Sequence, residues 1–198
     1  MKTHAKVVII GGGAMGVGLL YHLTKEGWSD VVLVEKGELT SGSTWHAAGL
    51  IPHFIGSLSM AKIHYYSSEL YKKLEKETGQ ATGWHGCGAI RLAVNQDQVD
   101  WFHYVKGVLD QVGAECHLLG PKEIKKVHPL LNTDGILMGA YTTGDGHTDP
   151  SGVTHAMAIG AKNRGAEIVR NNRVTDINTL HSGEWEVALD SNALQYGG

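Results

Sequence analysis

The segment Gly11-Gly12-Gly13-Ala14-Met15-Gly16 has the GxGxxG spacing of a turn that binds a dinucleotide. In such a turn the first glycine permits a tight bend, the second lets the backbone approach a pyrophosphate, and the third allows a helix to pack on a strand. The start of the following helix offers unpaired N–H groups to the phosphates. Glu35 follows 19 residues after Gly16, where a carboxylate can accept hydrogen bonds from the adenosine ribose. These residues predict an adenine dinucleotide site.

The elements needed to position that turn are present around it. Val7–Ile10 is wholly apolar and β-branched, which predicts a parallel strand buried on both faces. A helix is expected from Ala14 to Gly27, and a second buried strand over Val31–Val34. Together they form one βαβ unit. An acid at position 35 disfavours a 2′-phosphate and hence NADP, but the fingerprint leaves NAD and FAD open.

Residues 41–49, SGSTWHAAG, combine groups that suit the rest of a flavin dinucleotide. The hydroxyl and N–H groups of Ser43 and Thr44 can bind a diphosphate or ribityl chain. The Ala47-Ala48-Gly49 run is small enough to lie against a flat ring. His46 carries an imidazole that can act as a nucleophile. A loop, a short helical turn and an extended exit are expected over residues 37–56.

At these residues the chain resembles the dimethylglycine dehydrogenase and sarcosine dehydrogenase group of the D-amino-acid-oxidase-like flavoproteins. The resemblance rests on GGGAMG, on Val34-Glu35-Lys36, on STWHAAG and on DGHTDPSGVTHAMAIGAKNRGAEI. It implies bound FAD and oxidative demethylation of an N-methyl amine such as dimethylglycine or sarcosine. A hydride would pass to flavin N5, and the resulting imine would be hydrolysed to formaldehyde or captured by tetrahydrofolate in a longer parent protein.

The resemblance also implies which residues contact the cofactor. In the group, the histidine at the position of His46 is joined covalently to the flavin; a hydrogen-bonded histidine beside non-covalent FAD remains the alternative. No catalytic base is named, because the group builds much of its substrate site from later segments. The expected FAD-binding residues are Gly11, Gly13, Ala14, Met15, Gly16, Glu35, Lys36, Gly42, Ser43, Thr44, Trp45, His46, Ala47, Ala48, Gly49, Leu50 and Val174.

The fold class expected is α/β, with a Rossmann-like FAD-binding domain that is discontinuous and incomplete. Residues 1–85 and 145–198 would form it, and residues 86–144 would begin an inserted, β-rich substrate domain. A helix starting at Asp149-Pro150, a strand from Glu167 and a hairpin about His181-Ser182-Gly183 would follow the insertion. The last eight residues, SNALQYGG, complete no element, so we expect a fragment of a longer protein.

For the other candidate site residues we favour a structural role over a functional one. The 12 histidines lack HxH or HExxH spacing, so no metal site is predicted. His147 and Asp149 could line an active site, but Asp149 is placed to cap a helix. Arg91 could bind a substrate carboxylate, but a solvent-facing strand position is expected.

Composition narrows the class of protein. A net charge of −3 without charged blocks predicts neither nucleic-acid nor membrane partners. Cys87 and Cys116 are expected as reduced thiols, and the location as cytoplasmic, or the mitochondrial matrix for a eukaryotic parent. The electron acceptor would be an electron-transfer flavoprotein or oxygen. Three alternatives stay open: an amine or amino-acid oxidase with non-covalent FAD, an NAD-dependent dehydrogenase, and a truncated, non-catalytic nucleotide-binding fragment.

Overall fold

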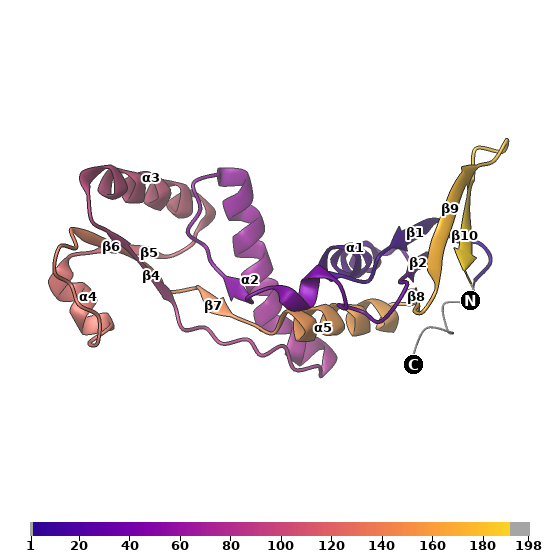
Figure 1. Ribbon diagram of the computed structural model, residues 1–198, viewed down its shortest axis with the longest axis horizontal. Coiled ribbons are helices and arrows are strands. Elements are labelled where there is room, and N and C mark those ends of the chain that lie inside the picture. Colours follow the sequence, from indigo (N-terminus) through magenta and orange to yellow (C-terminus); the bar gives the residue numbers. More distant parts are fainter. Residues whose placement is uncertain (1, 191–198) are drawn as a thin grey trace. The chain divides into compact units, whose positions relative to one another are not determined.

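The computed structural model describes residues 2–190 and divides the chain into two compact units (Figure 1). The first contains the chain up to Ala48, Leu74–Thr82 and the residues from Asp149 onward. The second contains Gly49–Lys73 and Gly83–Thr148. The SNALQYGG segment lies outside the described residues. The assignment of residues 1–85 and 145–198 to an FAD domain, and of 86–144 to a substrate domain, stays a prediction.

The first unit is built on a parallel sheet in the order β1-β2-β8, formed by β1 (Val7–Ile10), β2 (Val31–Val34) and β8 (Glu167–Val169). Helix α1 (Ala14–Lys25) joins the first two strands and packs against both, and α5 (Pro150–Asn163) packs against α1 and leads into β8. The expected α/β class with a Rossmann-like βαβ unit is therefore confirmed. An antiparallel hairpin of β9 (Arg173–Thr179) and β10 (Trp185–Asp190) follows, as predicted.

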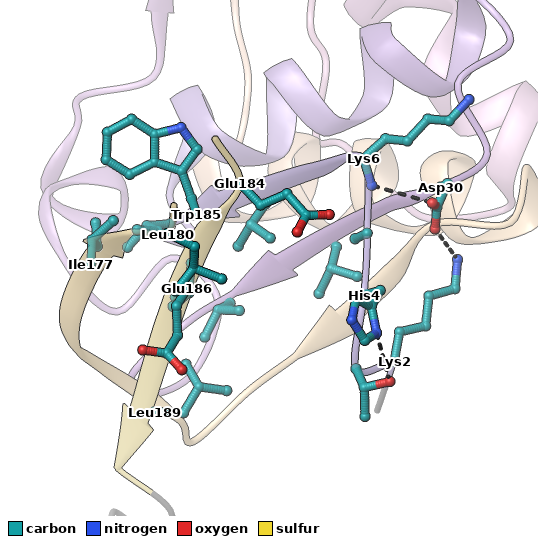
Figure 2. Close-up of a pocket in the computed structure, with 17 residues that line it drawn as sticks. Lys2, His4, Lys6, Asp30, Ile177, Leu180, Glu184, Trp185, Glu186 and Leu189 are labelled. Atoms are coloured by element: carbon teal, nitrogen blue, oxygen red, sulfur yellow. Dashed lines mark hydrogen bonds and ion pairs between the residues drawn. The ribbon is translucent and has the colours of Figure 1, made fainter. Parts of the chain in front are cut away.

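The prediction that β1 is buried on both faces is wrong. Ile9 is buried, but Val8 and Ile10 are exposed. They line a hollow of about 950 Å³ together with Val32 from β2 and Trp185 from β10. Figure 2 shows Trp185 among the side chains around this hollow. An apolar strand sequence indicates that both faces of the strand favour burial. Within the described residues, however, the hairpin covers the second face only in part.

In the second unit an antiparallel sheet in the order β4-β6-β5 carries helices on its connections. The strands are β4 (Ala89–Ala93), β5 (Cys116–Leu119) and β6 (Met138–Thr142). Helix α3 (Gln96–Val112) connects the first two strands and α4 (Pro121–Val127) follows β5. Asn95 accepts a hydrogen bond from the Gln98 N–H and caps α3, and Gly113 ends it in the left-handed conformation.

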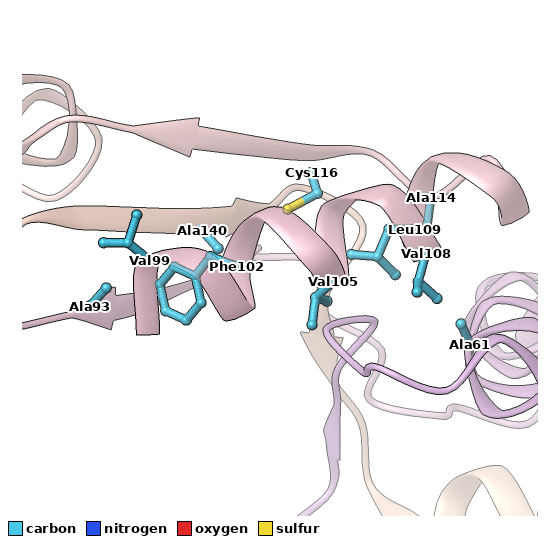
Figure 3. Close-up of a cluster of buried hydrophobic side chains, with 10 residues drawn as sticks. All are labelled: Ala61, Ala93, Val99, Phe102, Val105, Val108, Leu109, Ala114, Cys116 and Ala140. Atoms are coloured by element: carbon cyan, nitrogen blue, oxygen red, sulfur yellow. The ribbon is translucent and has the colours of Figure 1, made fainter. Parts of the chain in front are cut away.

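The core of the second unit lies between α3 and this sheet (Figure 3). Phe102, Val105 and Leu109 from α3 meet Cys116 and Ala140 from the sheet. Its remaining elements are β3 (Leu50–Ile51), which pairs with β7 (Gly146–His147), and most of α2 (Leu58–Thr78), whose last turns belong to the first unit. Both cysteines are free thiols, as expected. No helix among residues 2–190 is long and apolar enough to cross a bilayer.

Candidate functional site

The glycine-rich turn connects β1 to α1 with very little space around it. Gly11 has a φ of +108° and donates its N–H to the Val34 carbonyl at 2.8 Å. A Cβ added at Gly16 would lie 2.0 Å from the Gly11 carbonyl oxygen, so a side chain there cannot be accommodated without backbone movement. Gly13 stands at the N-cap of α1 without a side-chain cap. The first turn of α1 therefore presents main-chain N–H groups that suit an anion.

Glu35 closes one side of this turn from the end of β2. Its side chain is buried, with 8% of its surface exposed. One carboxylate oxygen accepts a hydrogen bond from the Gly12 N–H at 2.6 Å, and the other accepts one from the Gly37 N–H at 2.8 Å. The carboxylate is thus fixed beside the turn, and its remaining lone pairs can accept hydrogen bonds from ligand hydroxyl groups. The neighbouring Lys36 is exposed.

A 3₁₀ turn, η1 (Ser43–His46), closes the other side. The Thr44 hydroxyl oxygen accepts a hydrogen bond from the Ala14 N–H at 2.9 Å, although 30 residues separate them. The His46 Nδ1 lies 3.1 Å from the Gly42 carbonyl oxygen, and the His46 ring is 4.9 Å from that of Trp45. The expected loop, helical turn and extended exit are confirmed by η1 and β3.

Large apolar side chains beside these groups are open to solvent. Met15 is 89% exposed at the first turn of α1, and Trp45 is 63% exposed on η1. Single exposed apolar side chains are common on protein surfaces. Here, however, they flank a cluster of main-chain donors and a fixed carboxylate. The arrangement suits a ligand with an anionic part, hydroxyl groups and a flat apolar part.

The predicted site residues fall into three groups. The first group lies in the first unit, around the turn described above, and consists of the predicted residues from Gly11 to Gly16, Glu35, Lys36 and those from Gly42 to Ala48. Gly49 and Leu50 belong to the second unit. Val174 lies on β9, two residues after Asn172, whose N–H donates to the Glu35 carbonyl at 3.0 Å. These placements leave the binding roles themselves as predictions.

Asp149 and Arg91 have the structural surroundings that the sequence favoured for them. Asp149 caps α5, since its carboxylate accepts hydrogen bonds from the N–H groups of Ser151 and Gly152 at 3.1 and 3.0 Å. Arg91 is exposed, with its guanidinium 5.1 Å from the Phe54 ring centre. His147 forms a β-bridge with His85. Across residues 2–190 no group of three or more potential metal ligands gathers.

Sequence reasoning missed two polar arrangements. Thr40 lies directly before the predicted flavin segment, is buried, and has a φ of +70°. In the second unit, His53 is buried with its Nε2 2.6 Å from the Ser68 hydroxyl and its Nδ1 3.6 Å from Asp145. Burial lowers the pKa of His53, and the nearby Asp145 opposes that effect. Neither arrangement has a local sequence signal, since each depends on contacts between separate segments.

Comparison with known proteins gives a consistent picture. Residues 6–195 match the family described as FAD dependent oxidoreductase. The chain is 46% identical over 194 residues to human mitochondrial dimethylglycine dehydrogenase, covering 98% of this chain and 22% of that protein. It is 38% identical over 178 residues to human mitochondrial sarcosine dehydrogenase, covering 89% of this chain and 19% of that protein.

A solved structure resembles the whole fold. The L-proline dehydrogenase of P. horikoshii superimposes with a TM-score of 0.86 at 27% identity, covering 96% of this chain and 50% of the other. The chain thus spans about a fifth of the length of the two human relatives and half of this structure.

Proposed function

This chain belongs to the family of FAD-dependent oxidoreductases, and we propose that its glycine-rich turn, Glu35 and η1 bind FAD. The observation that carries the proposal is the pair of hydrogen bonds that join these three segments. Glu35 is fixed to Gly12 at 2.6 Å, and Thr44 is fixed to Ala14 at 2.9 Å. They hold a carboxylate, the first turn of α1 and a histidine around one turn.

Each group has a place in this proposal. The first turn of α1 binds the pyrophosphate through the N–H groups near Met15, and Glu35 accepts hydrogen bonds from the adenosine ribose. Lys36 adds a cation beside the ribose, and the backbone of Val174 meets the adenine. The small residues Ala47 and Ala48, which follow His46, lie along the flavin.

The hydrogen bond at His46 selects the ring nitrogen that could attach to the flavin. A carbonyl oxygen can only accept, so in the neutral ring Nδ1 must carry the proton that is donated to Gly42. Nε2 then holds the free lone pair and is the nucleophilic atom. We propose that FAD is joined covalently to His46 through Nε2.

The substrate proposed is a small N-methyl amine such as dimethylglycine or sarcosine. The names of the two human relatives support this class, and they concern proteins much longer than this chain. When bound, FAD supplies the oxidation by accepting a hydride from the N-methyl carbon. Water or tetrahydrofolate takes the one-carbon unit, and an electron-transfer flavoprotein or oxygen accepts the electrons. A mitochondrial or cytoplasmic location belongs to the same proposal.

The test is to incubate the 198-residue chain with FAD, precipitate it with acid and measure flavin fluorescence in the washed pellet. The expected result is fluorescence that stays with the protein and disappears in His46→Ala. His22→Ala is the matched control, because the His22 Nδ1 also lies at hydrogen-bond distance, 2.6 Å, from a carbonyl four residues earlier.

The fractions distinguish the alternatives. Flavin that is retained by the native chain but released by acid would contradict the covalent bond and favour a non-covalent amine or amino-acid oxidase. A chain that binds NAD and no FAD would overturn the cofactor assignment. Covalent flavin that no secondary or tertiary amine reduces would contradict catalysis by this chain and favour a nucleotide-binding fragment.

A further inference from the structure

Thr40 adopts a backbone conformation that its side chain disfavours. Among the described residues, the non-glycine positions with positive φ are Thr40, at +70°, and Asn171, at +55°. Asparagine visits this region readily, whereas a β-branched residue there is a genuine outlier. Such a conformation is energetically unfavourable and persists only where the surrounding structure enforces it.

Three hydrogen bonds enforce it, and each reaches a different segment. The Thr40 N–H donates to the Gly12 carbonyl at 3.0 Å, within the glycine-rich turn. The Thr40 carbonyl accepts from the Trp45 N–H at 3.3 Å, within η1. The Ser151 hydroxyl, in the first turn of α5, donates to the Thr40 hydroxyl oxygen at 3.1 Å.

Those contacts depend on the sign of φ. Rotation to an ordinary negative φ would turn the N–H away from Gly12 and reorient the peptide that follows, which holds the start of η1. The Gly12 carbonyl would lose its partner, and the Thr44 hydroxyl would no longer be held beside Ala14. Thr40 is itself buried, and its N–H, carbonyl and hydroxyl groups each hydrogen-bond to another segment of the protein. Its influence on a ligand must pass through the two segments that it joins.

We propose that Thr40 is a positioning residue of the nucleotide site, held in its strained conformation by the Ser151 hydroxyl. It aligns the anion-binding turn at Gly12 with the histidine-bearing turn η1. This inference rests on the proposed function, because it assigns the strain to binding of the FAD nucleotide. Ser151 thereby links the first turn of α5 to that site.

The experiment measures the dissociation constant of ADP for the full 198-residue chain by calorimetry. ADP is the probe because it lacks the isoalloxazine ring and cannot attach to His46, so binding is at equilibrium. The variants are Thr40→Val, which keeps the shape and removes the hydroxyl, Ser151→Ala and the double variant. Thr154→Val is the matched control: Thr154 is fully buried in α5, and its hydroxyl donates to the Pro150 carbonyl at 2.8 Å.

Each single variant should weaken ADP binding about fivefold, the loss of roughly one hydrogen bond. The double variant should bind ADP no more than about twofold more weakly than the weaker single variant, because both changes release the same conformation. Thr154→Val should lower the melting temperature yet keep the dissociation constant within about twofold. Thr40→Asn, which tolerates positive φ and keeps a polar group, should bind as the wild type does.

Wild-type affinity in Thr40→Val and Ser151→Ala would overturn the inference while leaving the FAD site intact. Losses that multiply in the double variant, or an equal loss in Thr154→Val, would also overturn it, since they indicate independent or general destabilisation. If Thr40→Val does not fold, Ser151→Ala and Thr40→Asn decide the question alone. A wild-type chain that binds neither ADP nor FAD would contradict the proposed function as well.

Discussion

The α-carbon of Gly16 faces the carbonyl oxygen of Gly11 so closely that a Cβ on Gly16 would lie 2.0 Å from that oxygen. Gly18, two residues later on the same helix, has no atom within 4 Å of the corresponding position. One helix thus contains a glycine that packing requires and a glycine that packing does not. The difference allows the turn to be tested within a single element.

Gly16→Ala should destabilise the chain by about 1–3 kcal/mol, because the new methyl group must displace backbone atoms of the turn. It should also abolish ADP binding, since that displacement moves the N–H groups at the start of α1. Gly18→Ala should instead raise stability by about 0.5–1 kcal/mol, the helical preference for alanine over glycine. Urea denaturation and ADP titration of the two variants measure both effects. Equal behaviour of the two variants would contradict the packing described for the turn.

Glu35→Gln should lower the free energy of unfolding by about 1–3 kcal/mol even without nucleotide. The carboxylate accepts from two main-chain N–H groups, and an amide offers a single oxygen for the two donors, so one buried donor loses its partner. Chemical denaturation of the nucleotide-free chain measures the loss.

The control for that variant is Glu38→Gln. Glu38 forms an exposed ion pair with Arg170 at 2.5 Å, and exposed pairs contribute about 0–1 kcal/mol. Similar losses in the two variants would show that the Glu35 carboxylate does not hold the turn.

The βαβ unit could be predicted because its signals are local. Apolar runs, the glycine spacing and the acid after β2 all lie within a short stretch of sequence. The same holds at α5, where Asp149 and Pro150 predict a helix start, and at the β9–β10 hairpin. In each case the residues that determine the backbone conformation lie within the element or directly beside it.

The prediction that was wrong and the arrangements that the sequence did not reveal all depend on contacts between distant segments. The exposure of Val8 and Ile10 is decided by what covers the sheet, and strand composition contains no information on that. The positive φ of Thr40 is imposed by Gly12, Trp45 and Ser151, so a threonine there has no turn signature. The assembly of His53 with Ser68 and Asp145 joins three separate segments in the same way.

Tyr21→Phe should reveal an alkaline limit to stability. Burial and the hydrogen bond from the Tyr21 hydroxyl to Glu77, at 2.7 Å, raise the pKa of Tyr21 to about 12. The Arg164 guanidinium, 4.4 Å from the Tyr21 ring centre and 2.8 Å from Glu77, completes this cluster between α1, α2 and α5. Between the ordinary tyrosine pKa near 10 and about 12, the unfolded chain loses this proton while the folded chain keeps it. Stability from Tyr21 is therefore complete below pH 10 and declines above it.

The melting temperatures of wild type and Tyr21→Phe at pH 9 and pH 11 measure this decline. The wild type should have a higher melting temperature than the variant at pH 9, and the difference between the two melting temperatures should narrow at pH 11. A difference that stays constant would contradict the raised pKa, because every other titrating group is common to both proteins.

His53→Gln should reduce the loss of stability that the chain undergoes as the pH is lowered. Burial lowers the pKa of His53 below its usual value near 6.5, against the opposing effects of Asp145 and Glu69 and with smaller support from Lys72 and His64. As pH falls below 6.5, the unfolded chain binds a proton on this ring that the folded chain resists, so stability is present above that pH and is lost below it. The free energy of unfolding should therefore fall more steeply between pH 7.5 and 5 in the wild type than in His53→Gln. His103→Gln, on the exposed side of α3, is the matched substitution at an exposed histidine. A variant at position 53 with the wild-type slope would show that the ring is protonated as readily in the folded chain as in the unfolded one.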